Sequence, residues 1–168
     1  MDLKSHLLVQ LESETALTRK AIARVPEGLN DFKPHEKSMT LGYLAALVAG
    51  MPGWIALMIE RDELNLDDSS SQGFRPRVAP TNAELIASFD TAVASGRRAL
   101  ESTTNEHLIT PWAFKMGGHA VSQDPRHLMI SNAVFSHLAH HRGQLTVYLR
   151  LNGAAVPALY GPSADEQH

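Results

Sequence analysis

The sequence predicts an all-α protein, a four-helix bundle formed by a single domain over residues 1–168. Four stretches carry apolar residues at helical spacing. Three long connections that contain proline, glycine and polar residues separate these stretches. With 43% hydrophobic and 20% charged residues, the chain has the composition of an ordinary globular domain that buries a substantial core.

The first helix is expected from about Leu3 to Val25, and Pro26 ends it because proline cannot continue a helix. Its predicted buried stripe keeps a spacing of three and four residues and consists of Leu11, Thr15, Thr18, Ile22 and Val25. The second helix begins after a cap at Ser38 or Thr40. Its apolar positions are Leu44, Leu47, Val48, Met51, Ile55 and Met58. We therefore expect Leu47 to face the core.

Pro52 interrupts the second helix, because it cannot donate to the carbonyl of Val48 and its ring crowds that turn. We expect a kink there, and a kink that only lets Trp54 pack is one interpretation of it. The polar connection from Asp62 to Pro80 has about 18 residues, more than the usual helix connection. It is either a crossover along the bundle or a lid over a site.

The third helix has the clearest start, because Thr81-Asn-Ala-Glu84 fits a capping box. Its predicted buried stripe is Leu85, Phe89, Val93, Gly96 and Leu100. The connection from Glu101 to Gln123 mixes aromatic residues and glycines, which is typical of a partly packed hairpin or flap. Asp124 is expected to cap the fourth helix, with Pro125 in its first turn, and Gly153 to end it.

The fourth helix, from Ser131 to Arg150, carries the candidate site. The stripe that would be buried holds Ile130, Val134, His137, His141, Gln144, Leu145 and Tyr148. His137 and His141 are four residues apart, so their rings lie on one side of the helix and can aim at a common point. A lone histidine on an apolar face is more often a core residue, but two at this spacing indicate a metal or catalytic site.

Two further basic residues of the same helix are expected to lie outside the buried stripe. His140 and Arg142 lie to one side of the stripe, where a surface or subunit contact is predicted. The segment from Val156 to Ser163 is too apolar for a loose tail and is expected to fold back. Asp165 and Glu166 would then pair with Arg142 or Arg150.

Composition argues against several classes of function. A net charge of −3 gives no basic footprint, so nucleic-acid binding is not expected. The absence of cysteine excludes disulfides, thiolate ligands and a cysteine nucleophile, and it fits a reducing interior. The residues from Met1 to His6 do not read as an export signal, and no run of about 18 apolar residues is recognised. We therefore expect a cytoplasmic protein without a membrane partner.

The run from His137 to Arg150, followed by the segment up to Glu166, resembles the C-terminal signature of the DinB/YfiT-like family. Upstream stretches are also similar to the family, namely Pro34 to Gly42 with Met51 to Ile55, and Trp112 to Gly118. The resemblance implies a four-helix bundle with one long crossover between the second and third helices, and a homodimer. It also implies a metal site with one histidine from the second helix and two from the last, and the latter correspond to His137 and His141.

The sequence departs from the family pattern at Leu47, which stands where the second helix of the family carries its histidine. A catalytic zinc site ordinarily has three protein ligands plus water. The two histidines alone are therefore expected to bind a divalent ion weakly, unless a loop or another subunit completes the shell.

Two functions remain open at this point. The first is a metal-dependent thiol S-transferase or hydrolase, in which His137 and His141 hold zinc or nickel and Gln144 or Tyr148 orients the substrate. The second is a metal-free, catalytically degenerate bundle that binds a small ligand or a protein partner through the same pocket. Leu47 favours the second, because a missing ligand usually lowers metal affinity more than surrounding groups can restore.

Overall fold

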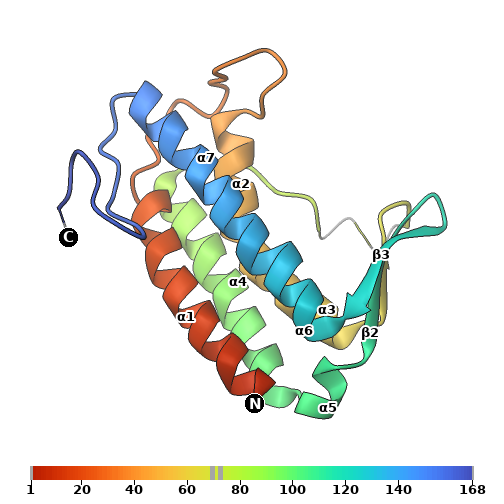
Figure 1. Ribbon diagram of the computed structural model, residues 1–168. Coiled ribbons are helices and arrows are strands. Elements are labelled where there is room, and N and C mark those ends of the chain that lie inside the picture. The colour runs from red at the N-terminus through yellow and green to blue at the C-terminus, as the bar shows by residue number, and fades with distance from the viewer. Residues whose placement is uncertain (1, 69–70, 72–73, 168) are drawn as a thin grey trace.

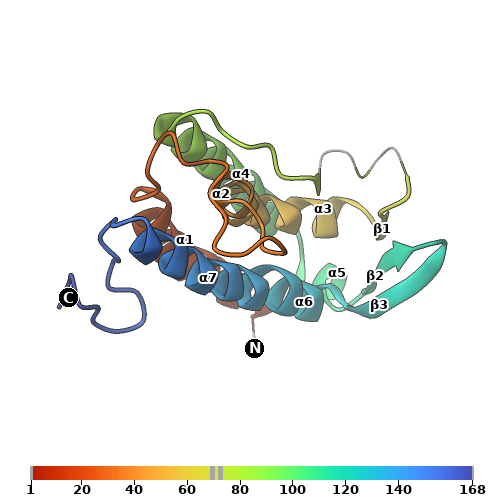
Figure 2. The same cartoon turned by 90° about the horizontal axis from the view of Figure 1, so that it is seen from above.

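The computed structural model describes residues 2–68, 71 and 74–167. The long helices lie side by side, and a small sheet projects from one end of them (Figures 1 and 2). The helical elements are α1 (Leu3–Ile22), α2 (Leu41–Gly50), η1 (Met51–Gly53), α3 (Trp54–Glu60), α4 (Asn82–Ser102), α5 (Asn105–Leu108), α6 (Arg126–Met129), η3 (Ile130–Ser136) and α7 (His137–Leu151). The strands are β1 (Glu63–Asn65), β2 (Pro111–Met116) and β3 (His119–Pro125). The prediction of a mostly helical protein is confirmed, but an all-α description omits the sheet.

Local sequence signals place most helix starts. The hydroxyl of Thr40 accepts from the backbone N–H of Tyr43 and caps α2. Thr81 and Glu84 form the predicted capping box at the start of α4. Pro52 lies in η1, a 3₁₀ turn that interrupts the helix between α2 and α3, as expected of an internal proline.

The sheet has the order β1-β2-β3. Strands β2 and β3 form an antiparallel hairpin that turns at Gly117 and Gly118, whose positive φ angles glycine adopts without a steric penalty. Strand β1 pairs with β2 in parallel, with Glu63 opposite Ala113. The hairpin was one of the two predicted alternatives for this connection. Strand β1 was missed, because three residues are too few to show an alternating pattern.

The start of the last helix differs from the prediction. Asp124 pairs with Trp112 in the sheet and does not cap a helix. Instead, the buried guanidinium of Arg126 donates to the carbonyl oxygens of Met58 and Pro111, at 3.0 and 2.8 Å. This side chain therefore ties the end of α3 and the base of the hairpin to the helix that carries the two histidines.

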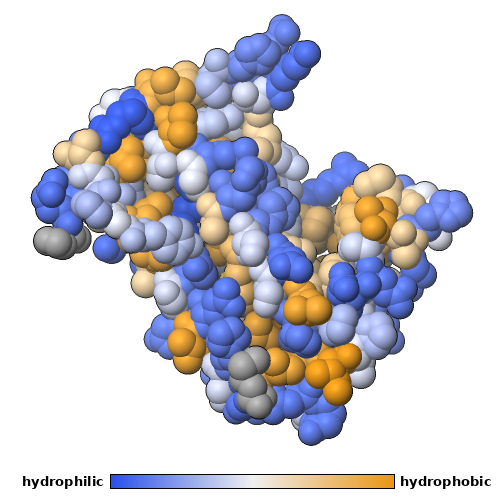
Figure 3. All heavy atoms as spheres, in the orientation of Figure 1, coloured by the Kyte–Doolittle hydropathy of each residue, from blue (hydrophilic) through white to orange (hydrophobic). Residues whose placement is uncertain are grey.

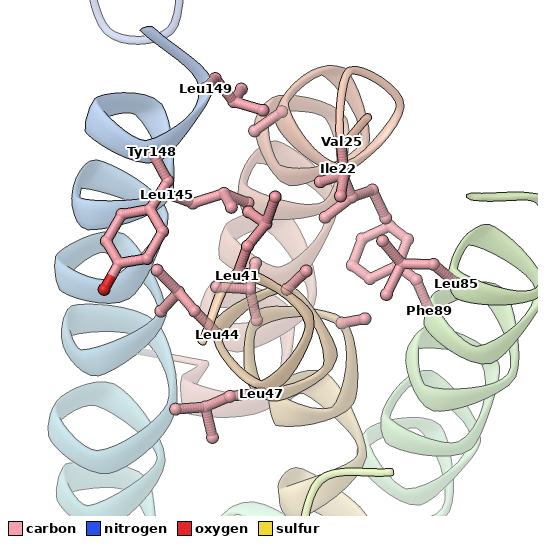
Figure 4. Close-up of a cluster of buried hydrophobic side chains, with 14 of the residues drawn as sticks. Ile22, Val25, Leu41, Leu44, Leu47, Leu85, Phe89, Leu145, Tyr148 and Leu149 are labelled. Atoms are coloured by element: carbon pink, nitrogen blue, oxygen red, sulfur yellow. The ribbon is translucent and has the colours of Figure 1, made fainter. Parts of the chain in front are cut away.

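The core consists of two clusters of buried apolar side chains. The first lies between α1, α2, α4 and α7, and Figure 4 shows its members Leu44 and Leu47 on the side of α2 that faces α7. The second lies nearer the sheet and includes Leu11, Ile55 and Trp112. All six apolar positions predicted for the second helix are buried. In the other predicted stripes, four residues are only partly buried, namely Thr15, Val93, His137 and Gln144.

One helical stretch, in which no long apolar run was recognised from the sequence, has the length and composition of a membrane span. This stretch is Leu41–Glu60, with a mean hydropathy of 1.7. However, most of this stretch is buried inside the molecule, and the core helices of folded domains meet the same criterion. Its apolar character is therefore accounted for by packing in the two core clusters.

The C-terminal tail folds back on α1 and α7, as predicted. Asp165 accepts from Arg150 at 2.6 Å, which confirms one expected ion pair, whereas Glu166 pairs with Arg24. Figures 1 and 2 show the tail beside the end of α7.

Arg142 is not on the flank of the molecule, so the prediction of a surface or subunit contact was wrong. Its side chain is fully buried and donates to the Glu14 carboxylate at 2.7 Å and to the Thr18 hydroxyl at 2.8 Å. It also donates to the hydroxyl of Tyr160, which in turn donates to Glu14. A buried charge is tolerated when it is paired and hydrogen-bonded, and here α1 and the tail supply the partners.

Candidate functional site

The helix that carries the histidines contains a π turn. Elements α6, η3 and α7 follow one another without a break, and η3 is a π-helix. The backbone N–H of His137 reaches the carbonyl of Asn132, five residues back, and not that of Ala133, four residues back as in an α-helix. The π turn thus lies directly before the pair of histidines, and such turns are frequent at functional sites.

The two imidazoles meet through one nitrogen each. The Nε2 atoms of His137 and His141 are 2.8 Å apart, and the ring centroids are 4.5 Å apart. Nδ1 of His141 lies 2.7 Å from Oε1 of Gln144, which can only accept, so Nδ1 carries a proton. The Gln144 contact therefore assigns the Nδ1–H tautomer to His141, whose Nε2 lone pair faces the His137 ring.

Both imidazoles are biased toward the neutral form. Burial is the main cause that lowers the pKa of His137. The backbone of Ala133 raises this pKa, and the charge of His140 lowers it further. Burial is also the main cause that lowers the pKa of His141. The hydrogen bond with Gln144 raises this pKa, and the charges of His137 and His140 lower it further. A neutral imidazole has a free lone pair for a metal ion or a proton.

The 2.8 Å contact between the two Nε2 atoms is satisfied without charge when His137 is the Nε2–H tautomer and donates to Nε2 of His141. A shared proton would instead make one ring an imidazolium, which burial disfavours. A divalent cation between the two nitrogens would be the other way to satisfy both Nε2 atoms, with each Nδ1 left as a donor, as in metal-binding histidines. Zinc-nitrogen bonds of about 2.0–2.1 Å at a tetrahedral angle place two nitrogens about 3.3 Å apart, so a small ring rotation is enough.

The other predicted site residues have distinct positions. Gln144 accepts a hydrogen bond from the His141 ring and so fixes the orientation of this ring. Tyr148 donates its hydroxyl to the carbonyl of Met39 at 3.0 Å and packs edge-on against Phe32. Leu47 is 9% exposed and belongs to the apolar core cluster. Within the described residues, no group of three or more His, Asp or Glu side chains could hold a metal ion.

Sequence reasoning missed a cavity next to the histidines. It has a volume of about 200 Å³ and lies where the hairpin meets the helices, a region that Figure 3 shows as hollowed. Its walls are mostly aromatic and apolar, formed by Trp54, Met58, Phe74, Trp112, Phe114, Ser122, Met129, Ala133 and His137. Trp54 stacks on Phe74, with centroids 4.2 Å apart. The signal was present in the sequence, because both tryptophans of the chain line this cavity.

Comparison with known proteins identifies the family. The model of the DinB family matches residues 1–168. The chain belongs to the DinB family. The resemblance noted in the sequence is thereby confirmed, and in this DinB protein the candidate site lies on the last helix, beside the aromatic cavity.

Individual relatives support this assignment. The uncharacterized protein YrdA of Bacillus subtilis (strain 168) is 26% identical over 162 residues, which cover 96% of this DinB protein and 90% of YrdA. The crystal structure of a DinB-like protein from Bacillus cereus ATCC 10987 has a TM-score of 0.66 at 20% identity, covering 89% of this chain and 92% of that one. The DinB-like protein YjoA of Bacillus subtilis has a TM-score of 0.69 at 18% identity, with 97% and 99% covered. These structures share the fold.

Proposed function

We propose that this DinB protein binds a divalent metal ion, zinc or nickel, through Nε2 of His137 and His141. The observation that carries the proposal is the convergence of two imidazoles, whose Nε2 atoms lie 2.8 Å apart while Nδ1 of His141 is held by Gln144. Gln144 would keep the His141 ring in place. A bound ion of this kind lowers the pKa of a coordinated water or thiol, which suits a thiol S-transferase or a hydrolase.

Leu47 limits the number of metal ligands in this proposal, because its apolar side chain cannot coordinate and the metal is left with two protein ligands. A site of two imidazoles has more open positions than a three-histidine site, and its affinity for metal alone is lower. We therefore propose that a substrate thiol completes the shell, so that metal and thiol bind together. His137 also borders the cavity, which would give an organic substrate access to this position.

The proposal includes the wider family arrangement. The side-by-side packing of α1, α2–α3, α4 and α6–α7 supports a four-helix bundle, with the connection between α3 and α4 as its crossover. A cytoplasmic homodimer is part of the same proposal. The alternative is a metal-free protein that binds an organic ligand or a protein partner, and the observations that favour it are Leu47 and the aromatic cavity.

Metal binding tests the proposal directly. Protein purified without a histidine tag is analysed for bound elements and then titrated with zinc and nickel in a calorimeter, with and without a simple thiol. We expect His137→Ala and His141→Ala to reduce zinc affinity at least tenfold and the thiol to increase the affinity of the parent. The matched control is His140→Ala, which removes an exposed imidazole from the same turn and should leave zinc affinity nearly unchanged. Equal affinity in all four proteins would contradict the metal site.

A further inference from the structure

A second cavity lies between α2, α3, α4 and the segment from Phe74 to Arg77. It has a volume of about 280 Å³, and its described lining includes neither His137 nor His141. Leu47 and Trp54 belong to the wall that α2 and α3 form, which is apolar. A cavity of about 150 Å³ is large enough to bind benzene, so this one has room for a benzene ring with a short chain.

Two arginines distinguish this cavity from the one beside His137. Arg75 and Arg77 both belong to the lining, with only Pro76 between them in the sequence. Both residues are exposed, and neither has an ion pair or a hydrogen bond within the part of the chain that the structure describes. No Asp or Glu belongs to the described lining. The lining therefore carries two positive charges and no negative one, in a chain with a net charge of −3.

The chemistry of this lining selects for an anion with an aromatic body. Ligand sites typically combine apolar and aromatic walls with a few polar or charged groups that fix orientation. The planar guanidinium of arginine matches the geometry of a carboxylate and can bind it through two hydrogen bonds. Trp54 and Phe74 both line the cavity and stack on each other, with ring centroids 4.2 Å apart, so the wall offers an aromatic surface to a ring.

We infer that this cavity binds a small aromatic carboxylate, with its ring against Trp54 and its carboxylate at Arg75 and Arg77. A neutral compound of the same shape would lack the charge-assisted hydrogen bonds, and a carboxylate without a ring would leave the apolar wall in water. The inference goes beyond the proposed function and does not depend on metal binding, because the described lining excludes both histidines.

A nitrogen-15 NMR titration of the full chain, treated with a chelator, tests the inference. The signals to follow are the backbone amides of Gly53 and Ser88, which line the cavity on two different helical elements. The probes are 3-phenylpropionate, 3-phenylpropionamide and acetate. We expect 3-phenylpropionate to bind about fivefold more tightly than the amide, which lacks the charge, and about tenfold more tightly than acetate, which lacks the ring. No saturable shift with 3-phenylpropionate, or equal affinity for it and either other probe, would overturn the inference.

Charge variants test the two arginines. Combining Arg75→Gln with Arg77→Gln should lower the affinity for 3-phenylpropionate to that for the amide and leave the affinity for the amide unchanged. Both positions are exposed, so the exchange removes charge without opening the core. The matched control is Arg98→Gln, which removes an exposed charge from α4 outside the described lining and should change neither affinity. Full affinity for 3-phenylpropionate in the double variant would overturn the inference.

A glycine in the wall allows the cavity to be filled. Gly50 belongs to the lining and has helical backbone angles, and a Cβ atom there would meet nothing within 4 Å. Gly50→Leu should therefore place a side chain in this open space and abolish the response of Gly53 and Ser88 to 3-phenylpropionate. Gly143→Leu adds the same side chain at an equally open helical position outside the described lining and should preserve the response. Equal binding by the two variants would place the ligand elsewhere and contradict the inference.

Discussion

At the scale of single residues, the two histidines differ in what the sequence reveals of them. The spacing of His137 and His141 was readable from the sequence, because helical geometry alone brings residues four apart together. The π turn before His137 was not, because no residue pattern indicates it. The sequence thus identified the pair, whereas the structure assigns the tautomer of His141.

The first prediction concerns the pH dependence of stability without metal. The pKa of both imidazoles is lowered in the folded chain, chiefly by burial, while the unfolded value is about 6.5. As pH falls below about 6.5, the unfolded chain gains protons before the folded chain does, so the free energy of unfolding decreases. The loss is complete below the lowered pKa values, and above about 6.5 the pair contributes no slope.

Urea unfolding of chelator-treated protein at a series of pH values between about 5 and 8 measures this effect. A variant with glutamine at both positions, His137→Gln with His141→Gln, lacks the titrating groups and should show a shallower decline below pH 6.5. Parallel curves for parent and variant would mean that the two imidazoles titrate alike in the folded and unfolded chain.

The burial of two arginines could not be predicted from the sequence. Arg142 was placed on a flank from its helical angle, yet Glu14, 128 positions away in the sequence, and the tail enclose it. Arg126 is likewise buried by contacts with Met58 and with Pro111. Such positions follow from tertiary partners, which helical periodicity does not reveal.

At the scale of elements, the contact between α4 and η1 depends on the absence of a side chain. A Cβ atom at Gly96 would lie 2.5 Å from the carbonyl oxygen of Pro52. We predict that Gly96→Ala lowers the free energy of unfolding by about 1–3 kcal/mol, because overpacking outweighs the better helix propensity of alanine. Gly143 is the control, since a Cβ there meets nothing within 4 Å. Gly143→Ala should raise the free energy of unfolding by up to about 1 kcal/mol, and urea midpoints compare the two.

The facing positions of α2 and α7 give a prediction for Leu47. Leu47→His should place a third imidazole beside His137 and His141 and complete a three-histidine set with an open position. Zinc affinity should rise steeply, and zinc at a hundred times the dissociation constant should stabilise the folded variant by about 2.7 kcal/mol. Combining Leu47→His with His141→Ala should remove the gain. A calorimetric titration in which Leu47→His binds zinc no better than the parent would show that α2 does not present position 47 to the pair.

Element boundaries were predictable where the signal was local. The caps at Thr40 and Thr81 and the interruption at Pro52 depend on residues within one turn, and all three were anticipated. The pairing of β1 with β2 joins residues some fifty positions apart through a three-residue strand, so neither length nor alternation indicated it.

At the scale of the whole molecule, the prediction of a homodimer stays open to measurement. Large apolar side chains remain exposed on α1 and α7, namely Val9, Val147 and Leu151. Light scattering should give a mass of twice 18.4 kDa, because a two-fold contact would cover such positions. Val147→Glu is the variant to compare if the contact includes α7. A mass of 18.4 kDa for the parent across micromolar concentrations would contradict the dimer.

The π turn of η3 has a consequence for comparing relatives. A π turn holds one residue more than an α-helical turn, so deleting a single residue between positions 130 and 136 would convert η3 to α-helix and leave Arg126 and His137 in nearly the same relative direction. Arg126 would then stay at the base of the hairpin. A one-residue gap in this window of an alignment therefore signals the loss of the π turn, whereas a gap of the same size in the connection after α3 changes only the length of that connection.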